Sequence, residues 1–153
     1  MRPRKANGPG SWKMDRKYKV IAVDFDETIG FGTWPTCIRG RQNKVLMKWL
    51  KKRRDMGDKI ILWTCREDFG GKRFNDWMYK EEAVKFCRDR GLVFDHVNEN
   101  DGETPEERSQ YSRKVNADVY IDDKAIPFNM GGWFSGLKWR LFLKLVERKL
   151  DQV

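Results

Sequence analysis

Short continuous apolar runs alternate along the chain with segments whose apolar residues recur every three or four positions. The continuous runs predict strands covered on both faces at residues 18–25, 59–64, 92–97 and 117–121. The periodic segments predict helices over 42–56, 78–90 and 135–150, the first two ended by Gly57 and Gly91. A further short helical stretch is expected near 109–116. In the last helix we expect one broad apolar face formed by Leu137, Leu141, Phe142, Leu145 and Val146.

Strands that alternate with helices predict right-handed crossovers between parallel strands. The expected architecture is therefore an α/β, doubly wound, Rossmann-like three-layer sandwich with a parallel sheet. With 153 residues the chain fits one domain, which we place at 18–153, after a flexible basic tail at 1–17. In folds of this class, ligands bind beyond the carboxyl ends of the strands.

Three cysteines, one histidine and the absence of a CxxC pattern argue against a disulfide scaffold or a structural zinc site. The sequence contains no apolar run of the roughly 20 residues that a membrane span needs, and no apolar signal segment near its start. We therefore expect an intracellular, cytoplasmic protein with no membrane partner. The single histidine, His96, falls in a predicted strand and is expected to be structural.

The net charge of +9 is unevenly distributed along the chain. Residues 1–17 carry six basic side chains and residues 39–54 carry eight, whereas residues 95–107 carry six acidic ones. Such asymmetry favours a polyanionic partner such as nucleic acid, contacted through the tail and residues 39–54. A solvated helix face with a disordered tail explains the same pattern equally well.

Acidic and hydroxyl residues follow three of the four predicted strands. The strand ends read Asp24-Phe25-Asp26-Glu27-Thr28, Thr64-Cys65-Arg66-Glu67 and Asp122-Asp123-Lys124. Carboxylates that meet at one edge of a sheet repel one another unless a cation neutralises them. Because the donors are all oxygen atoms, the expected cation is Mg²⁺, which commonly bridges carboxylates to a substrate phosphate. The pattern therefore favours phosphoryl transfer.

These strand ends resemble the motifs of the haloacid dehalogenase (HAD) superfamily of phosphotransferases. The sequences VIAVDFDET, IILWT and VYIDD match its first, second and fourth motifs in order, and a lysine precedes the last one. The likeness covers roughly residues 18–125, and the chain further resembles a group of short, cap-lacking members common in bacteria and phages. The IDD ending also resembles the 5′(3′)-deoxyribonucleotidase branch. The resemblance implies a Mg²⁺-dependent phosphatase.

The resemblance also implies a role for each matching residue. Asp24 would attack the substrate phosphorus and form an aspartyl-phosphate, while Asp26 would protonate the leaving oxygen and then deprotonate a water. Thr64 would hydrogen-bond a phosphoryl oxygen, and a lysine would offset the negative charge there. We assign Lys114, which precedes the final strand, with Lys124 as the alternative.

The remaining assignments concern the metal and the substrate. The Mg²⁺ ligands would be Asp24, Asp122, Asp123 and the backbone carbonyl of Asp26. Substrate contacts are expected from Thr28, the backbone N–H of Cys65 and Arg66. Arg66 would clamp a second phosphate or the leaving group, or else pair with Glu67. Many relatives have glycine at the position of Glu27, whose side chain would narrow the entrance or face solvent.

Neither of the two usual insertion points is long enough for a folded cap, because Gly30–Arg41 and residues 98–110 are both short. An open site accepts large substrates, or borrows a neighbouring subunit of a homo-oligomer as its lid. The sequence therefore supports three hypotheses. The first is a phosphomonoester phosphatase acting on a nucleotide or sugar phosphate, the second a polynucleotide end-phosphatase, and the third a catalytically silent nucleic-acid-binding module.

Overall fold

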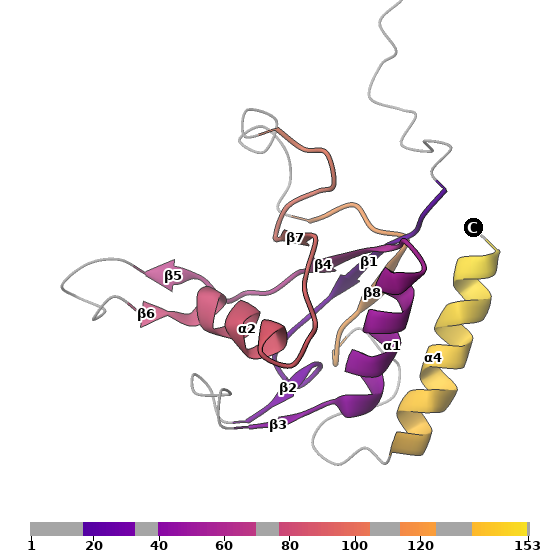
Figure 1. Cartoon of the computed structure of the whole chain (residues 1–153), viewed down its shortest axis with the longest axis horizontal. Coiled ribbons are helices and arrows are strands. Elements are labelled where there is room, and N and C mark those ends of the chain that lie inside the picture. The colour runs from indigo at the N-terminus through magenta and orange to yellow at the C-terminus, as the bar shows by residue number, and fades with distance from the viewer. Residues whose placement is uncertain (1–16, 33–39, 70–76, 105–113, 125–135, 153) are drawn as a thin grey trace, which may run out of the picture.

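A four-stranded parallel sheet forms the centre of the computed structural model, which describes residues 17–32, 40–69, 77–104, 114–124 and 136–152. Its strands are β1 (Val20–Val23), β4 (Lys59–Leu62), β7 (His96–Val97) and β8 (Val119–Ile121), arranged in the order β7-β4-β1-β8. Along the chain, β1, β4, β7 and β8 are respectively the first, second, third and fourth strands of this sheet. The order therefore reverses between β1 and β8, which pair side by side (Figure 1).

Both faces of the sheet are covered, as the continuous apolar runs predict. Ile21 and Val23 of β1 join a large cluster with all three described helices, whereas Val20 and Ala22 join a smaller cluster that includes Val115. All four of these β1 side chains are fully buried. The predicted α/β, Rossmann-like class is confirmed.

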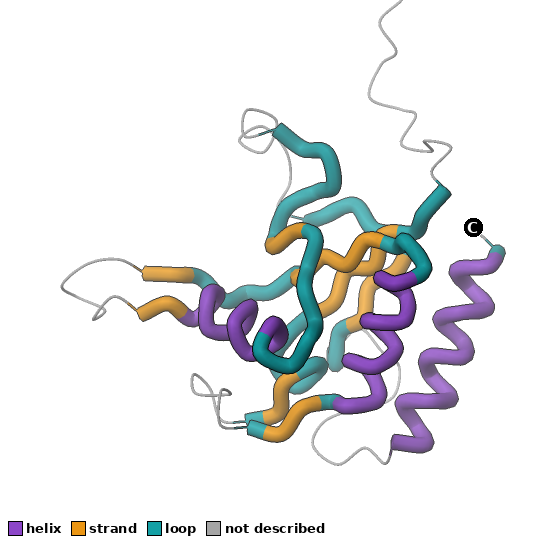
Figure 2. The backbone as a smooth tube through the Cα atoms, in the orientation of Figure 1, coloured by secondary structure: helices purple, strands orange, loops and turns teal. Residues whose placement is uncertain are grey.

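The helices are α1 (Lys44–Asp55), α2 (Tyr79–Arg88) and α4 (Gly136–Asp151). Asn43 caps α1, since its side-chain oxygen accepts a hydrogen bond from the N–H of Leu46 at 3.1 Å. Past the ends of α1 and α2, Gly57 and Gly91 adopt positive φ angles of 97° and 77°, which glycine tolerates without steric cost. Helix α4 lies beside α1 (Figures 1 and 2).

The prediction of the buried face of α4 was wrong, because a different side of the helix packs against the rest of the protein. Trp139, Leu143, Val146 and Leu150 are the buried residues, whereas Leu137, Leu141 and Leu145 are 64%, 55% and 56% exposed. The helix is apolar around most of its circumference, so spacing alone does not select the packed side. The large Trp139 ring, which stacks edge-on with Phe142, defines that side instead.

Two small antiparallel pairs were not predicted. Strands β2 (Gly30–Phe31) and β3 (Arg41–Gln42) form one pair, and β5 (Asp68–Phe69) and β6 (Trp77–Met78) form the other. Two-residue strands are too short to show the alternation that reveals longer ones. β7 is also shorter than the predicted strand at 92–97.

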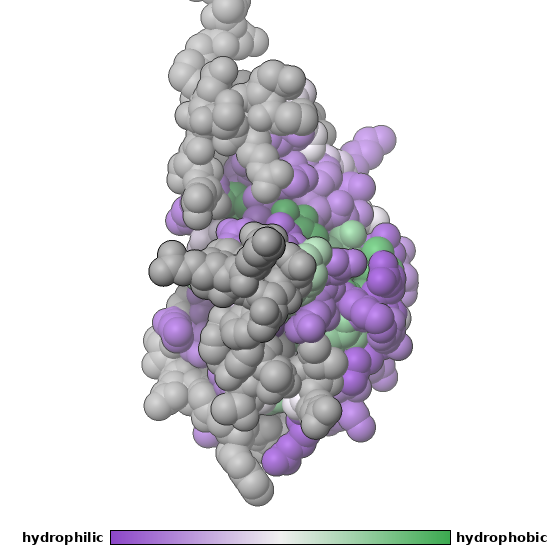
Figure 3. Space-filling view, turned by 90° about the vertical axis from the view of Figure 1, so that its left-hand side faces the viewer, coloured by the Kyte–Doolittle hydropathy of each residue, from purple (hydrophilic) through white to green (hydrophobic). Residues whose placement is uncertain are grey.

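The short helix expected near 109–116 falls mostly outside the described residues, and its described part, 114–116, is not helical. The tail expected at 1–17 also lies outside them, apart from Lys17. Within the described chain, no helix has the length and apolar character required to cross a bilayer. The described surface in Figure 3 is mainly hydrophilic.

Candidate active site

Three carboxylates meet where the strand order reverses. Asp24 directly follows β1, and Asp122 and Asp123 directly follow β8. One oxygen from each lies within 4.8 Å of the others. The backbone holds this arrangement, since the N–H of Asp24 donates to the carbonyl of Ile121 at 2.9 Å. The crevice at such a reversal is the usual ligand-binding place of open α/β sheets.

The electrostatics of this acidic cluster (Asp24, Asp122 and Asp123) are unfavourable without a counter-charge. Burial raises the pKa of Asp24 to about 7, and the carboxylates of Asp122, Asp26 and Asp123 add to the rise, against a hydrogen bond from the Phe25 N–H that lowers it. Burial and Asp122 also raise the pKa of Asp123. A bound cation removes this repulsion, and three carboxylate oxygens are ligands that suit Mg²⁺.

Thr28 positions one side of the acidic cluster. Its side chain is fully buried, and its hydroxyl oxygen accepts a hydrogen bond from the backbone N–H of Asp123 at 3.0 Å. Its carbonyl accepts another from the side chain of Asn43 at 3.0 Å. Thr28 thus links the turn after β1 to the end of β8 and to the start of α1. Direct contact with a substrate stays a prediction.

The turn after β1 contains a non-glycine residue in the left-handed region, Glu27, with φ at 56°. The carbonyl of Phe25 accepts hydrogen bonds from the N–H groups of Ile29 and Gly30, which closes the turn tightly. The half-buried Glu27 lies close enough to Asp123 to contribute to the rise in its pKa. Its charge therefore adds to the negative potential of the acidic cluster.

Asp26 is held by a buried arginine. The guanidinium of Arg66 donates to both carboxylate oxygens of Asp26, from Nε at 2.9 Å and from Nη2 at 2.7 Å. Arg66 has a side-chain exposure of 0%, lies over the ring of Phe25 at 5.0 Å and reaches the carbonyl of Tyr79 at 3.4 Å. This two-point contact fixes the orientation of the carboxylate. In the structure, the side chain of Arg66 thus contacts Asp26, and its contact with a substrate stays a prediction.

Thr64 is fixed by a residue that the sequence analysis missed. Asn98, just after β7, accepts from the N–H of Thr64 and donates to its carbonyl, both at 2.8 Å. The hydroxyl oxygen of Thr64 accepts from the N–H of Arg66 at 3.2 Å, and among the described residues its own proton has no acceptor. Cys65, between them, is exposed. The signal in the sequence was an asparagine directly after an apolar run, because asparagine tolerates the left-handed conformation that Asn98 adopts, with φ at 54°.

The two candidate lysines lie in different surroundings. The exposed Lys114 has its ammonium 5.0 Å from the ring centroid of Tyr120, whereas Lys124 lies close enough to Asp123 to lower its pKa. The choice between them stays a prediction. His96 is in β7 as expected, with Nε2 at 2.9 Å from the Asp101 carboxylate, in agreement with a structural role.

One solved structure similar to this chain is that of a protein from Bacteroides thetaiotaomicron, described as a conserved protein. The two superpose with a TM-score of 0.60 and share 32% sequence identity, and the match covers 86% of this chain and 92% of the other. No family model and no curated protein matches the chain.

Proposed function

The chain belongs to the same family as the conserved protein from Bacteroides thetaiotaomicron, and we propose that it is a Mg²⁺-dependent phosphomonoester phosphatase of the HAD type. The observation that carries the proposal is the meeting of Asp24, Asp122 and Asp123 at the reversal of strand order. Each of them follows a strand that bears a HAD-like motif. The raised pKa of Asp24 reflects burial first and repulsion by the neighbouring carboxylates second, and a bound cation would offset both.

Asp24 is the proposed nucleophile. A carboxylate oxygen of Asp24 forms a bond to phosphorus while the bond from phosphorus to the leaving oxygen breaks, which gives an aspartyl-phosphate. Water then attacks the same phosphorus, phosphate leaves, and the Asp24 carboxylate is regenerated. Mg²⁺ held by the acidic cluster and by the carbonyl of Asp26 would neutralise negative charge on Asp24 and on the phosphoryl group.

Asp26 is the proposed acid and base. It gives its proton to the leaving oxygen in the first step and takes one from the attacking water in the second, so protons balance over the cycle. Arg66 keeps the Asp26 carboxyl group in one orientation for both proton transfers. Proton transfer by such a positioned group typically contributes about 10²–10⁴ in rate.

Thr64 is the proposed contact to the transferring phosphoryl group. Its hydroxyl proton, together with the N–H of the exposed Cys65, is suited to hydrogen-bond the phosphoryl oxygens. The two hydrogen bonds to Asn98 hold the Thr64 backbone in place, which favours a preorganised site. A lysine, Lys114 or Lys124, completes the charge balance. Nucleotide and sugar phosphates are the proposed small substrates.

Release of phosphate from an aryl phosphate tests this proposal. Wild-type protein should release phosphate in Mg²⁺ and stop when EDTA is added, and Asp24→Asn should abolish release in Mg²⁺. Asp55→Asn, the same chemical change at an exposed residue ending α1, should retain it. Release that survives Asp24→Asn rejects the nucleophile. If wild type releases no phosphate from this or a panel of phosphomonoesters, the silent binding module replaces the phosphatase.

A further inference from the structure

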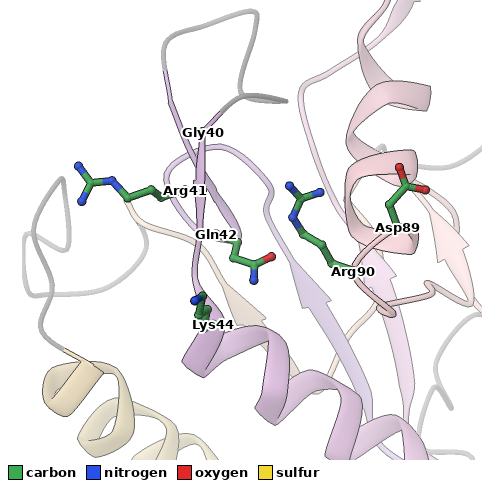
Figure 4. A pocket seen from close by; sticks show the side chains of 6 residues that line it. All are labelled: Gly40, Arg41, Gln42, Lys44, Asp89 and Arg90. Carbon is green, nitrogen blue, oxygen red and sulfur yellow. The ribbon is translucent and has the colours of Figure 1, made fainter.

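A basic groove lies between β3 and the carboxyl end of α2. It has a volume of about 620 Å³ and is lined by Gly40, Arg41, Gln42, Lys44, Asp89 and Arg90. Figure 4 shows Gln42 and Arg90 extending toward each other across it, while Arg41 extends from the other side of β3. None of these residues belongs to the acidic cluster or its supporting contacts.

The groove carries an excess of positive charge. Its one acidic residue, Asp89, is paired with Lys85 at 2.6 Å. The guanidinium of Arg90 is held over the ring of Phe86 at 3.6 Å and donates to the Phe86 carbonyl at 3.0 Å. These contacts orient Arg90 without neutralising it. Its charge therefore stays available to an anion.

The positive charge continues along α1 from the groove. The exposed Lys44, Lys48 and Lys52 recur every four residues, which spans about 12 Å of helix at 1.5 Å per residue. Within the described chain, these lysines and Arg41 form no ion pair with an acidic side chain. Like charges at this spacing repel, and the first turn of α1 has no acidic residue to complement the helix dipole. A row of uncompensated cations fits a polymer with regularly spaced negative charges.

The groove is close to the proposed catalytic site. Gln42 pairs with Gly30, and Gly30 forms an isolated bridge with Asp26. Two inter-strand steps therefore separate the backbones of Gln42 and Asp26, about 10 Å at 4.8 Å per step. A chain whose terminal phosphate lies at Asp24 has its following phosphates within reach of the groove.

We propose that this groove binds the phosphodiester backbone of a nucleic-acid strand, so that the substrate class of the site is a polynucleotide with a terminal phosphomonoester. The side-chain oxygen of Gln42 is buried and has no hydrogen-bond partner among the described residues, so a polar ligand that moves this side chain into the groove would supply the missing donor. The assignment of a substrate, though not of the groove as a binding site, rests on the proposed phosphatase function.

Binding of a labelled single-stranded oligonucleotide without a terminal phosphate tests the groove independently of catalysis. Fluorescence anisotropy is measured over a range of salt for wild type, for Arg41→Gln/Lys44→Gln and for Arg90→Gln. Lys144→Gln/Arg148→Gln, which removes two exposed charges from α4, is the matched control. Each lost phosphate contact should reduce the slope of log affinity against log salt by roughly 0.7. Because Arg90 also packs on Phe86, the Arg41/Lys44 variant keeps the test valid if Arg90→Gln unfolds.

The proposal predicts that both groove variants lose oligonucleotide affinity and that the α4 variant does not. It also predicts that their kcat/KM falls roughly tenfold or more on an oligonucleotide with a terminal phosphate, relative to an aryl phosphate. Equal losses on both substrates, or binding unchanged from wild type, overturn it. Salt-dependent binding through the groove without phosphate release from any ester rejects the phosphatase and keeps the binding site. Release from the aryl ester without such binding rejects the groove alone.

Discussion

Replacing Asp24 with asparagine should stabilise the metal-free protein above neutral pH. Burial and the neighbouring carboxylates raise the pKa of Asp24 from 3.8 to about 7. The unfolded chain therefore releases this proton near pH 4, whereas the folded chain keeps it until near pH 7. Between these values the folded state binds more protons, so stability falls as the pH rises and the full penalty applies above pH 7. Asparagine has no charge to bury, and its oxygen still accepts the Phe25 N–H.

The difference between the two pKa values corresponds to about 4 kcal/mol at 1.36 kcal/mol per pKa unit. Asp24 is only partly buried, and solvent screening reduces the penalty. We therefore expect Asp24→Asn to gain roughly 2–4 kcal/mol at pH 8 without metal, and much less at pH 4.5, where most of the wild-type penalty is absent.

Urea unfolding in EDTA at pH 8 and pH 4.5 measures this gain, with Asp55→Asn as the control that should change little at either pH. Adding Mg²⁺ at pH 8 should stabilise the wild type and have a smaller effect on Asp24→Asn, because the variant has lost one ligand. A variant no more stable than wild type at pH 8, or equally stabilised at both pH values, would refute the reasoning.

Three further substitutions test the supporting contacts. Arg66→Lys retains the charge but loses the two-point contact with Asp26, so kcat on an aryl phosphate should fall roughly tenfold or more while KM changes little; an unchanged kcat contradicts the positioning role. Asn98→Gly removes both hydrogen bonds to Thr64 while tolerating the positive φ, and should cost about 1–3 kcal/mol in urea unfolding; no loss means that the bonds contribute nothing net. Glu27→Gly should relieve a φ of 56° and raise the unfolding free energy by about 1 kcal/mol, whereas a decrease means that the Glu27 side chain stabilises the turn.

The strands that position the acidic cluster were predictable, because β1, β4 and β8 are buried on both faces and read as continuous apolar runs. The predicted strand ends then placed Asp24, Asp122 and Asp123 at one edge, where the structure brings them together. The small pairs β2–β3 and β5–β6 were not predictable, since two residues carry no periodicity. The prediction of the buried face of α4 was wrong because apolar residues cover most of the circumference of this helix.

Contacts between side chains far apart in the sequence were also not predicted. Arg66 and Asp26 were both candidates, yet their pairing spans 40 residues of sequence, and it depends on how the loop after β4 packs against Phe25. Thr28 was expected at the substrate, which stays a prediction, and the hydrogen bond that its hydroxyl oxygen accepts from the Asp123 N–H was not foreseen. Asn98 was overlooked because it follows an edge strand of two residues. Such roles depend on the fold around each residue rather than on local pattern.

Chemical trapping of a phosphorylated aspartate tests the central claim most directly. Protein turning over an aryl phosphate in Mg²⁺ is quenched, its acyl phosphates are reduced with borohydride, and the modified residue is located by peptide mass spectrometry. Homoserine is expected at position 24, and none is expected when EDTA is present. Phosphate release with Asp24 unmodified, or with the modification on another carboxylate, would contradict it.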